Sequence, residues 1–98
     1  PASAPTLISS GTTFFNPNAK IEFKWSLVSG VAKYFVTIKD PQGQIAGGYN
    51  DNPVAVDKEG NNPQVVVSTL APDTTYTITI RAWNRAGEES LMFTITTP

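Results

Sequence analysis

The side chains that enzymes most often use for nucleophilic attack and metal binding are missing from this sequence. Its 98 residues include no Cys and no His, so Ser–His–Asp, Cys–His and thiolate–zinc sites are excluded. The remaining titratable candidates are eight acids: Glu22, Asp40, Asp51, Asp57, Glu59, Asp73, Glu88 and Glu89. Most of these acids fall in predicted turns or on outward strand positions, where carboxylates are usually solvated. A glycosidase site would need two carboxylates in one cleft. We expect no enzymatic activity and no cofactor.

Oxygen ligands are concentrated between Asn50 and Asn62, and calcium is the metal that we weigh here because it takes oxygen ligands. This segment contains Asp51, Asp57 and Glu59 but lacks the EF-hand spacing, and Lys58 lies among the acids. An ordinary polar loop explains the same composition, because Asn, Asp and Gly favour turns. We therefore predict no metal site.

The elements that position these residues are strands, because apolar residues alternate with polar ones and no segment has helical periodicity. Strong alternation covers residues 21–25, 34–39 and 76–83, and weaker strands are predicted at 7–9, 45–49, 64–70 and 91–96. Residues 51–63 are predicted as the longest exposed loop. Seven short strands at this spacing predict a single all-β sandwich over residues 1–98, with linker-like ends at 1–4 and 97–98. The expected core contains Trp25, Tyr34, Leu70, Tyr76, Ile78 and Ile80.

Two large aromatic residues are predicted on the outward side of this sandwich. If Tyr34, Ile78 and Ile80 point inward, then Phe35 and Trp83 point outward. Together with Arg81 stacked on an aromatic ring, and with Tyr49 from the next strand, they would form a contact surface. Such a surface would suit a neighbouring domain, a protein partner or a sugar ring. The alternative is cross-strand pairing that only stabilises the sheet.

The segment LAPDTTY, residues 70–76, resembles the Leu-x-Pro-x-x-x-Tyr segment of fibronectin type III domains. The strand after it, from Tyr76 to Gly87, is similar to the following strand of that family, and Trp25 and Tyr34 match its central aromatics. The resemblance implies a seven-stranded antiparallel immunoglobulin-like Greek-key sandwich, with sheets A, B, E and C, C′, F, G. The loop 84–90 lacks the Arg-Gly-Asp tripeptide of the family's adhesive members, so adhesion through that motif loses support.

A tyrosine corner is also expected from the residues themselves. Tyr76 lies six residues after Leu70, which closes the preceding strand. Its ring can pack in the core while its hydroxyl bonds to nearby backbone.

Charge and composition narrow the function further. Seven basic and eight acidic residues give a net charge of −1, which provides no electrostatic footprint for nucleic acid or an anionic membrane. We expect a monomeric, non-catalytic spacer or interaction module of a larger extracellular or cell-surface protein, of the type found in bacterial glycoside hydrolases and surface proteins. Its partners would be neighbouring domains of the same chain, a polysaccharide or another protein. The alternative is a carbohydrate-binding module that uses the exposed aromatics.

Overall fold

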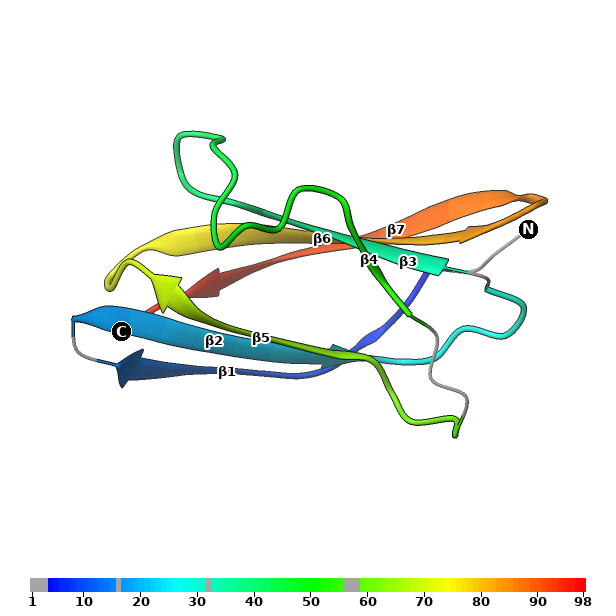
Figure 1. The fold of residues 1–98 in the computed structure, drawn as a ribbon, viewed down its shortest axis with the longest axis horizontal. Helices are drawn as coiled ribbons and strands as arrows, with labels where there is room; N and C mark the ends of the chain where they lie inside the picture. Colours follow the sequence, from blue (N-terminus) through cyan, green and yellow to red (C-terminus); the bar gives the residue numbers. More distant parts are fainter. Residues whose placement is uncertain (1–3, 16, 32, 56–58) are drawn as a thin grey trace.

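The structure is a computed structural model that describes residues 4–15, 17–31, 33–55 and 59–98. Seven strands form two antiparallel sheets packed face to face (Figure 1). They are β1 (Leu7–Phe15), β2 (Asn18–Trp25), β3 (Lys33–Lys39), β4 (Asn52–Val54), β5 (Gln64–Leu70), β6 (Thr75–Asn84) and β7 (Gly87–Thr96). One sheet has the order β1-β2-β5 and the other β4-β3-β6-β7, which confirms the two predicted sheets. The described part of the chain contains no helix that could cross a membrane.

The core lies between the sheets because alternate residues of the central strands point inward. Strands β2, β3 and β6 each alternate buried and half-buried positions along their length. Trp25 is fully buried, with its ring 5.6 Å from Tyr34 in an edge-to-face arrangement and 6.0 Å from Phe23. All six residues predicted for the core are buried.

The edge strand of the four-stranded sheet was predicted at the wrong place. The segment 45–49 is joined to β3 by an isolated Ile45–Lys39 bridge and by backbone hydrogen bonds of Ile38 with Ala46 and Tyr49, but it forms no regular strand. Gly47 and Gly48 adopt positive φ angles of 64° and 77° that turn the chain. The edge strand is β4, at Asn52–Val54, inside the segment that we had predicted as loop. Pro53 is tolerated there because one side of an edge strand needs no backbone donor.

The two ends of the described chain lie at opposite ends of the sandwich. Strand β1 begins at one end of the long axis and β7 finishes at the other (Figure 1). The principal extents are 42 × 28 × 18 Å. We had expected residues 97–98 to be linker-like, but Thr97 is only 2% exposed, and the carbonyl of Pro98 accepts a hydrogen bond from the amide of Asp73. Of the other predicted end, residues 1–3 lie outside the described residues.

Candidate functional site

The predicted contact residues Phe35, Arg81 and Trp83 lie on the outward face of the four-stranded sheet. Phe35 on β3 is directly opposite Arg81 on β6, and Lys33 is opposite Trp83. Because side chains alternate between faces, Phe35, Arg81 and Trp83 share the outward side. All three are half-buried.

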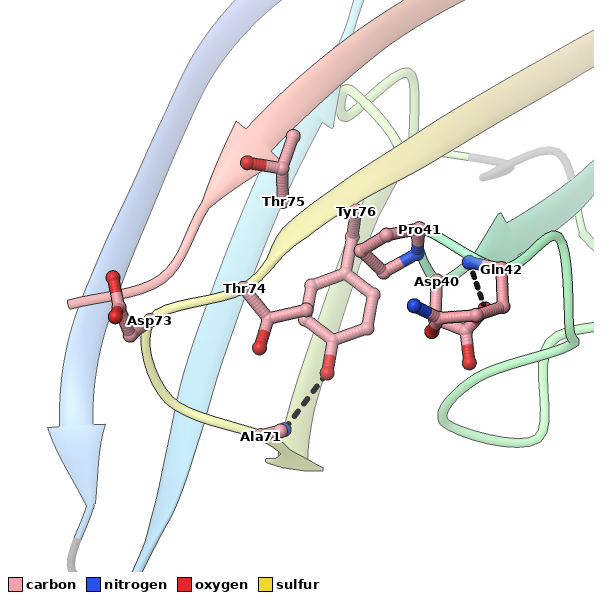
Figure 2. A pocket seen from close by; sticks show the side chains of 8 residues that line it. All are labelled: Asp40, Pro41, Gln42, Ala71, Asp73, Thr74, Thr75 and Tyr76. Atoms are coloured by element: carbon pink, nitrogen blue, oxygen red, sulfur yellow. Dashed lines mark hydrogen bonds between the residues drawn. The ribbon is translucent and has the colours of Figure 1, made fainter.

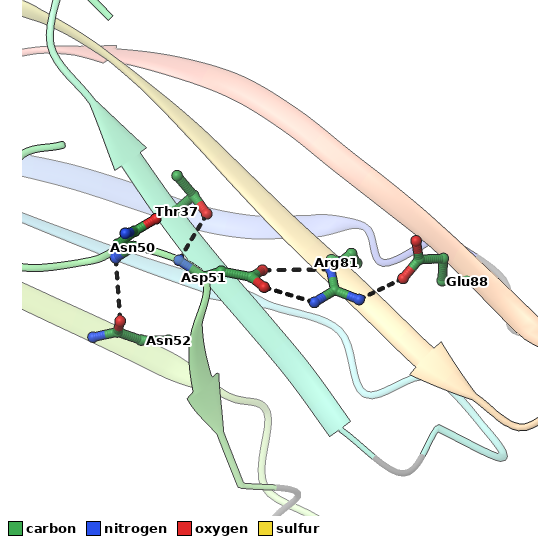
Figure 3. A network of polar contacts seen from close by, with 6 residues as sticks. All are labelled: Thr37, Asn50, Asp51, Asn52, Arg81 and Glu88. Carbon is green, nitrogen blue, oxygen red and sulfur yellow. Dashed lines mark hydrogen bonds and ion pairs between the residues drawn. The ribbon is translucent and has the colours of Figure 1, made fainter. Parts of the chain in front are cut away.

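Arg81 is the centre of this face. Its guanidinium carbon lies 4.3 Å from the centroid of the Phe35 ring, which is the predicted stacking. The same guanidinium forms ion pairs with Asp51 at 2.8 Å and with Glu88 at 2.5 Å (Figure 3). These hydrogen bonds, the one to Glu88 first and then the one to Asp51, raise the pKa of Arg81 above its usual range. Arg81 therefore joins β6 to β7 and to the segment that leads into β4.

The position of Asp51 is set by its own loop. Its φ angle is 55°, and its amide donates a 3.0 Å hydrogen bond to Thr37 Oγ1 on β3. Beside it, the Asn52 side chain accepts a hydrogen bond from the amide of Asn50 (Figure 3). The same side chain donates one to the carbonyl of Gly48. The hydrogen bonds within this loop therefore hold the Asp51 carboxylate next to Arg81.

At the far end of the same sheet, the second residue of β6 is a buried tyrosine. Tyr76 is 3% exposed, and its hydroxyl accepts a 2.8 Å hydrogen bond from the amide of Ala71 (Figure 2). Leu70, which closes β5, is also buried. This is the predicted tyrosine corner, and it fixes the crossover between the two sheets.

The comparisons with known proteins agree with these features. The family model described as "Fibronectin type III domain" matches residues 3–97. The chain belongs to the fibronectin type III family. Its fold is similar to the crystal structure of a fibronectin type III domain of human collagen XX, with a TM-score of 0.61 and 20% sequence identity over 99% of this chain and 97% of that chain. No curated protein matches the chain.

Two of the predicted contact residues, Phe35 and Arg81, touch each other in this fibronectin type III domain as a stacked pair. Trp83 lies two residues further along β6 on the same outward face, opposite Glu88 on β7. Tyr49 is half-buried and packs against the hydrophobic core.

Sequence reasoning missed the two acids that bind Arg81. Glu88 could have been found, because the predicted turn at 84–87 sets the β6–β7 register and places it diagonally across from Arg81. Asp51 could not, because no periodic pattern marks the three-residue strand β4.

A cavity of about 540 Å³ in this fibronectin type III domain lies beside the tyrosine corner (Figure 2). It is lined by Asp40, Pro41, Gln42, Ala71, Asp73, Thr74, Thr75 and Tyr76. One carboxylate oxygen of Asp40 already accepts hydrogen bonds from the amides of Gln42 and Gln44, both at 2.9 Å. The Asp40 side of the cavity is therefore a hydrogen-bonded turn.

The described residues contain no group of three or more His, Cys, Asp or Glu side chains that could hold a metal ion. Within the polar segment 50–62, which we weighed for calcium and predicted to hold no metal, the Asp51 carboxylate is paired with Arg81. Asp57 and Lys58 lie outside the described residues.

Proposed function

We propose that this fibronectin type III domain is a non-catalytic spacer and interaction module in a longer chain. The observation that carries the proposal is the placement of its ends. A chain that enters at β1 and leaves after β7 is displaced along the 42 Å axis of the sandwich, so flanking domains would be held apart by about one domain length.

The chemistry of the described surface supports a non-catalytic role. The cation with the most contacts, Arg81, is already bound by two carboxylates and an aromatic ring. The cavity beside Tyr76 contains two carboxylates, and Asp40 is committed to its own turn. The Thr74 and Thr75 hydroxyls beside the cavity are hydrogen-bonded to the Pro72 carbonyl and the Thr96 hydroxyl rather than to a carboxylate that could activate them.

We extend the proposal to an extracellular or cell-surface host of bacterial type. Its support is compositional: charged residues are 15% of the chain, Cys is absent, and Thr and Asn are abundant. The partners would be neighbouring domains of the same chain or another protein, which agrees with the use of this family as modules.

The carbohydrate-binding alternative loses support from the Phe35–Arg81 contact. A sugar ring binds an aromatic ring by covering its face, and the guanidinium already occupies one face of Phe35. Tyr49 packs against the core, so Trp83 is the remaining large aromatic of the predicted platform. A glycan-array survey with Trp83→Ala as the paired variant would restore this alternative if it detected binding that the variant lost.

The spacer role is tested in the full-length protein that carries residues 1–98. The domain is deleted in one version and replaced by an unrelated sandwich domain of the same length in a second. A spacer predicts that deletion impairs the host and that replacement restores it. If neither change has an effect, the spacer role is wrong, and if replacement fails to restore function, a specific contact surface is required.

A further inference from the structure

One polar side chain is buried among the described residues, and it lies just beyond the last strand. Thr97 is 2% exposed. Its hydroxyl accepts a 2.9 Å hydrogen bond from the amide of Thr74 and donates to the carbonyl of Ala71 at 2.8 Å, with the carbonyl of Thr74 at 3.2 Å. A buried hydroxyl that satisfies both a backbone donor and a backbone acceptor replaces the water that both groups have lost.

Backbone hydrogen bonds also hold Thr97 and Pro98 to the same loop. The amide of Thr97 donates to the carbonyl of Thr74 at 2.9 Å, and the amide of Asp73 donates to the carbonyl of Pro98 at 2.8 Å. The chain after β7 is therefore bonded on both sides of the Thr97–Pro98 peptide.

The crossover that receives these bonds is itself fixed to the core. The amide of Ala71 donates to the Tyr76 hydroxyl at 2.8 Å (Figure 2). The carbonyl of Ala71 accepts from the Thr97 hydroxyl, so one residue joins the buried tyrosine to the segment after β7. Thr74 Oγ1 donates to the carbonyl of Pro72 at 2.8 Å and closes the loop. Tyr76, Ala71 and Thr97 thus form one connected series of hydrogen bonds from core to exit.

We propose that Thr97 fixes the direction in which the chain leaves the domain, so that a segment joined to Pro98 is held in a defined orientation instead of swivelling. The inference rests on the proposed spacer function and specifies it as a rigid connector. Strand ends normally fray, because their last residues have few partners. Here the hydroxyl of Thr97 and the backbone of both residues are bonded to a loop that the core holds in place.

The absence of Cys makes the orientation directly measurable. Two Cys residues are introduced, one added after Pro98 and one by Val66→Cys on the exposed outward face of β5. Each carries a nitroxide label, and pulsed electron resonance gives the distribution of distances between the two labels. We expect a narrow distribution for the otherwise unchanged chain. In parallel, the Thr97 amide should have an NMR order parameter of about 0.85, the value of rigid backbone.

The decisive variant is Thr97→Val, which keeps the shape of the side chain and removes the hydroxyl. The distance distribution should broaden, and the order parameter of residue 97 should fall below about 0.6. Thr97→Ser keeps the hydroxyl and should behave as the unchanged chain. Thr96→Val is the matched control, because Thr96 is exposed and its hydroxyl, as far as the described residues go, is bonded to that of Thr75 at 2.9 Å.

A broad distribution in the unchanged chain would overturn the proposal, and so would a Thr97→Val variant that remains as ordered as its parent. If Thr97→Val does not fold, the unchanged chain and Thr97→Ser still test the proposal, since the proposal requires a narrow distance distribution in both. These readouts concern the domain alone. A host that tolerates deletion of the domain would therefore disprove the spacer role without altering them.

Discussion

The hydroxyl of Tyr76 accepts a hydrogen bond from the backbone amide of Ala71, five residues earlier in the chain. The tyrosine ring lies in the core while the amide belongs to the crossover between the sheets. One contact therefore ties the start of β6 to the segment that carries the chain from one sheet to the other.

Tyr76→Phe should lower the free energy of unfolding by about 1–2 kcal/mol, because the Ala71 amide loses its partner in a part-buried place. Urea unfolding followed by Trp fluorescence measures the change. Tyr49→Phe is the control, since the described residues offer no hydrogen bond to the Tyr49 hydroxyl. Equal effects of the two substitutions would show that the Tyr76 hydroxyl contributes nothing specific.

Trp25→Ala should cost about 3–5 kcal/mol, since a fully buried ring leaves a cavity in a domain whose total stability is of similar size. Trp25→Phe should cost clearly less. The indole Nε1 is buried without a hydrogen-bond partner among the described residues, so Phe removes no hydrogen bond and retains most of the apolar volume. Circular dichroism melting of both variants separates the two costs, and a larger loss in Trp25→Phe would contradict this account.

Arg81→Gln should destabilise the domain by only about 0.5–1 kcal/mol, because its partners Asp51 and Glu88 are half-exposed and water screens such pairs. The loss should shrink in concentrated salt. Arg85→Gln, in the exposed turn between β6 and β7, is the matched control and should be neutral. Urea unfolding at low and high NaCl gives the comparison, and a salt-independent loss would point to the Phe35 contact instead.

The pH dependence of the Arg81 contribution follows from the direction of its pKa shift. The folded-state pKa is raised, chiefly by the hydrogen bond to Glu88, so the stabilisation is fully present below the unfolded-state pKa and is lost only as the pH rises through the folded-state value. Both lie in strongly alkaline solution. The difference in unfolding free energy between the parent and Arg81→Gln, measured by urea titration, should therefore stay constant from neutral pH to about pH 10 as far as Arg81 ionisation is concerned.

Gly47→Ala and Gly48→Ala form a pair that separates backbone strain from steric overlap. Both glycines have positive φ, which costs an L-residue about 1–2 kcal/mol. A Cβ on Gly47 would also lie 2.7 Å from Val67 Cγ1, whereas one on Gly48 would meet nothing within 4 Å. Thermal melting should show the larger loss for Gly47→Ala, and equal losses would mean that Val67 moves aside freely.

The strongly alternating segments of the sequence were sufficient to predict the central strands and the core. Residues 21–25, 34–39 and 76–83 each became a strand of the predicted sheet, because a half-buried strand must alternate in order to bury one face. The edge strand β4 was misplaced, because three residues that include Pro53 carry no periodic signal and the glycine turn before them sets where pairing begins.

By itself, the sequence determined the fold class, the fibronectin type III resemblance, the inward residues and the outward placement of Phe35, Arg81 and Trp83, since all of these follow from local periodicity and from spacing along one or two strands. Only the tertiary structure decided that Asp51 binds Arg81, that Tyr49 packs against the core, and that Thr97 is bonded to the crossover instead of being linker. Each of these contacts joins residues more than 20 positions apart or depends on the path of a loop. Their free energies depend on distance and burial in space, which no pattern of neighbouring residues encodes.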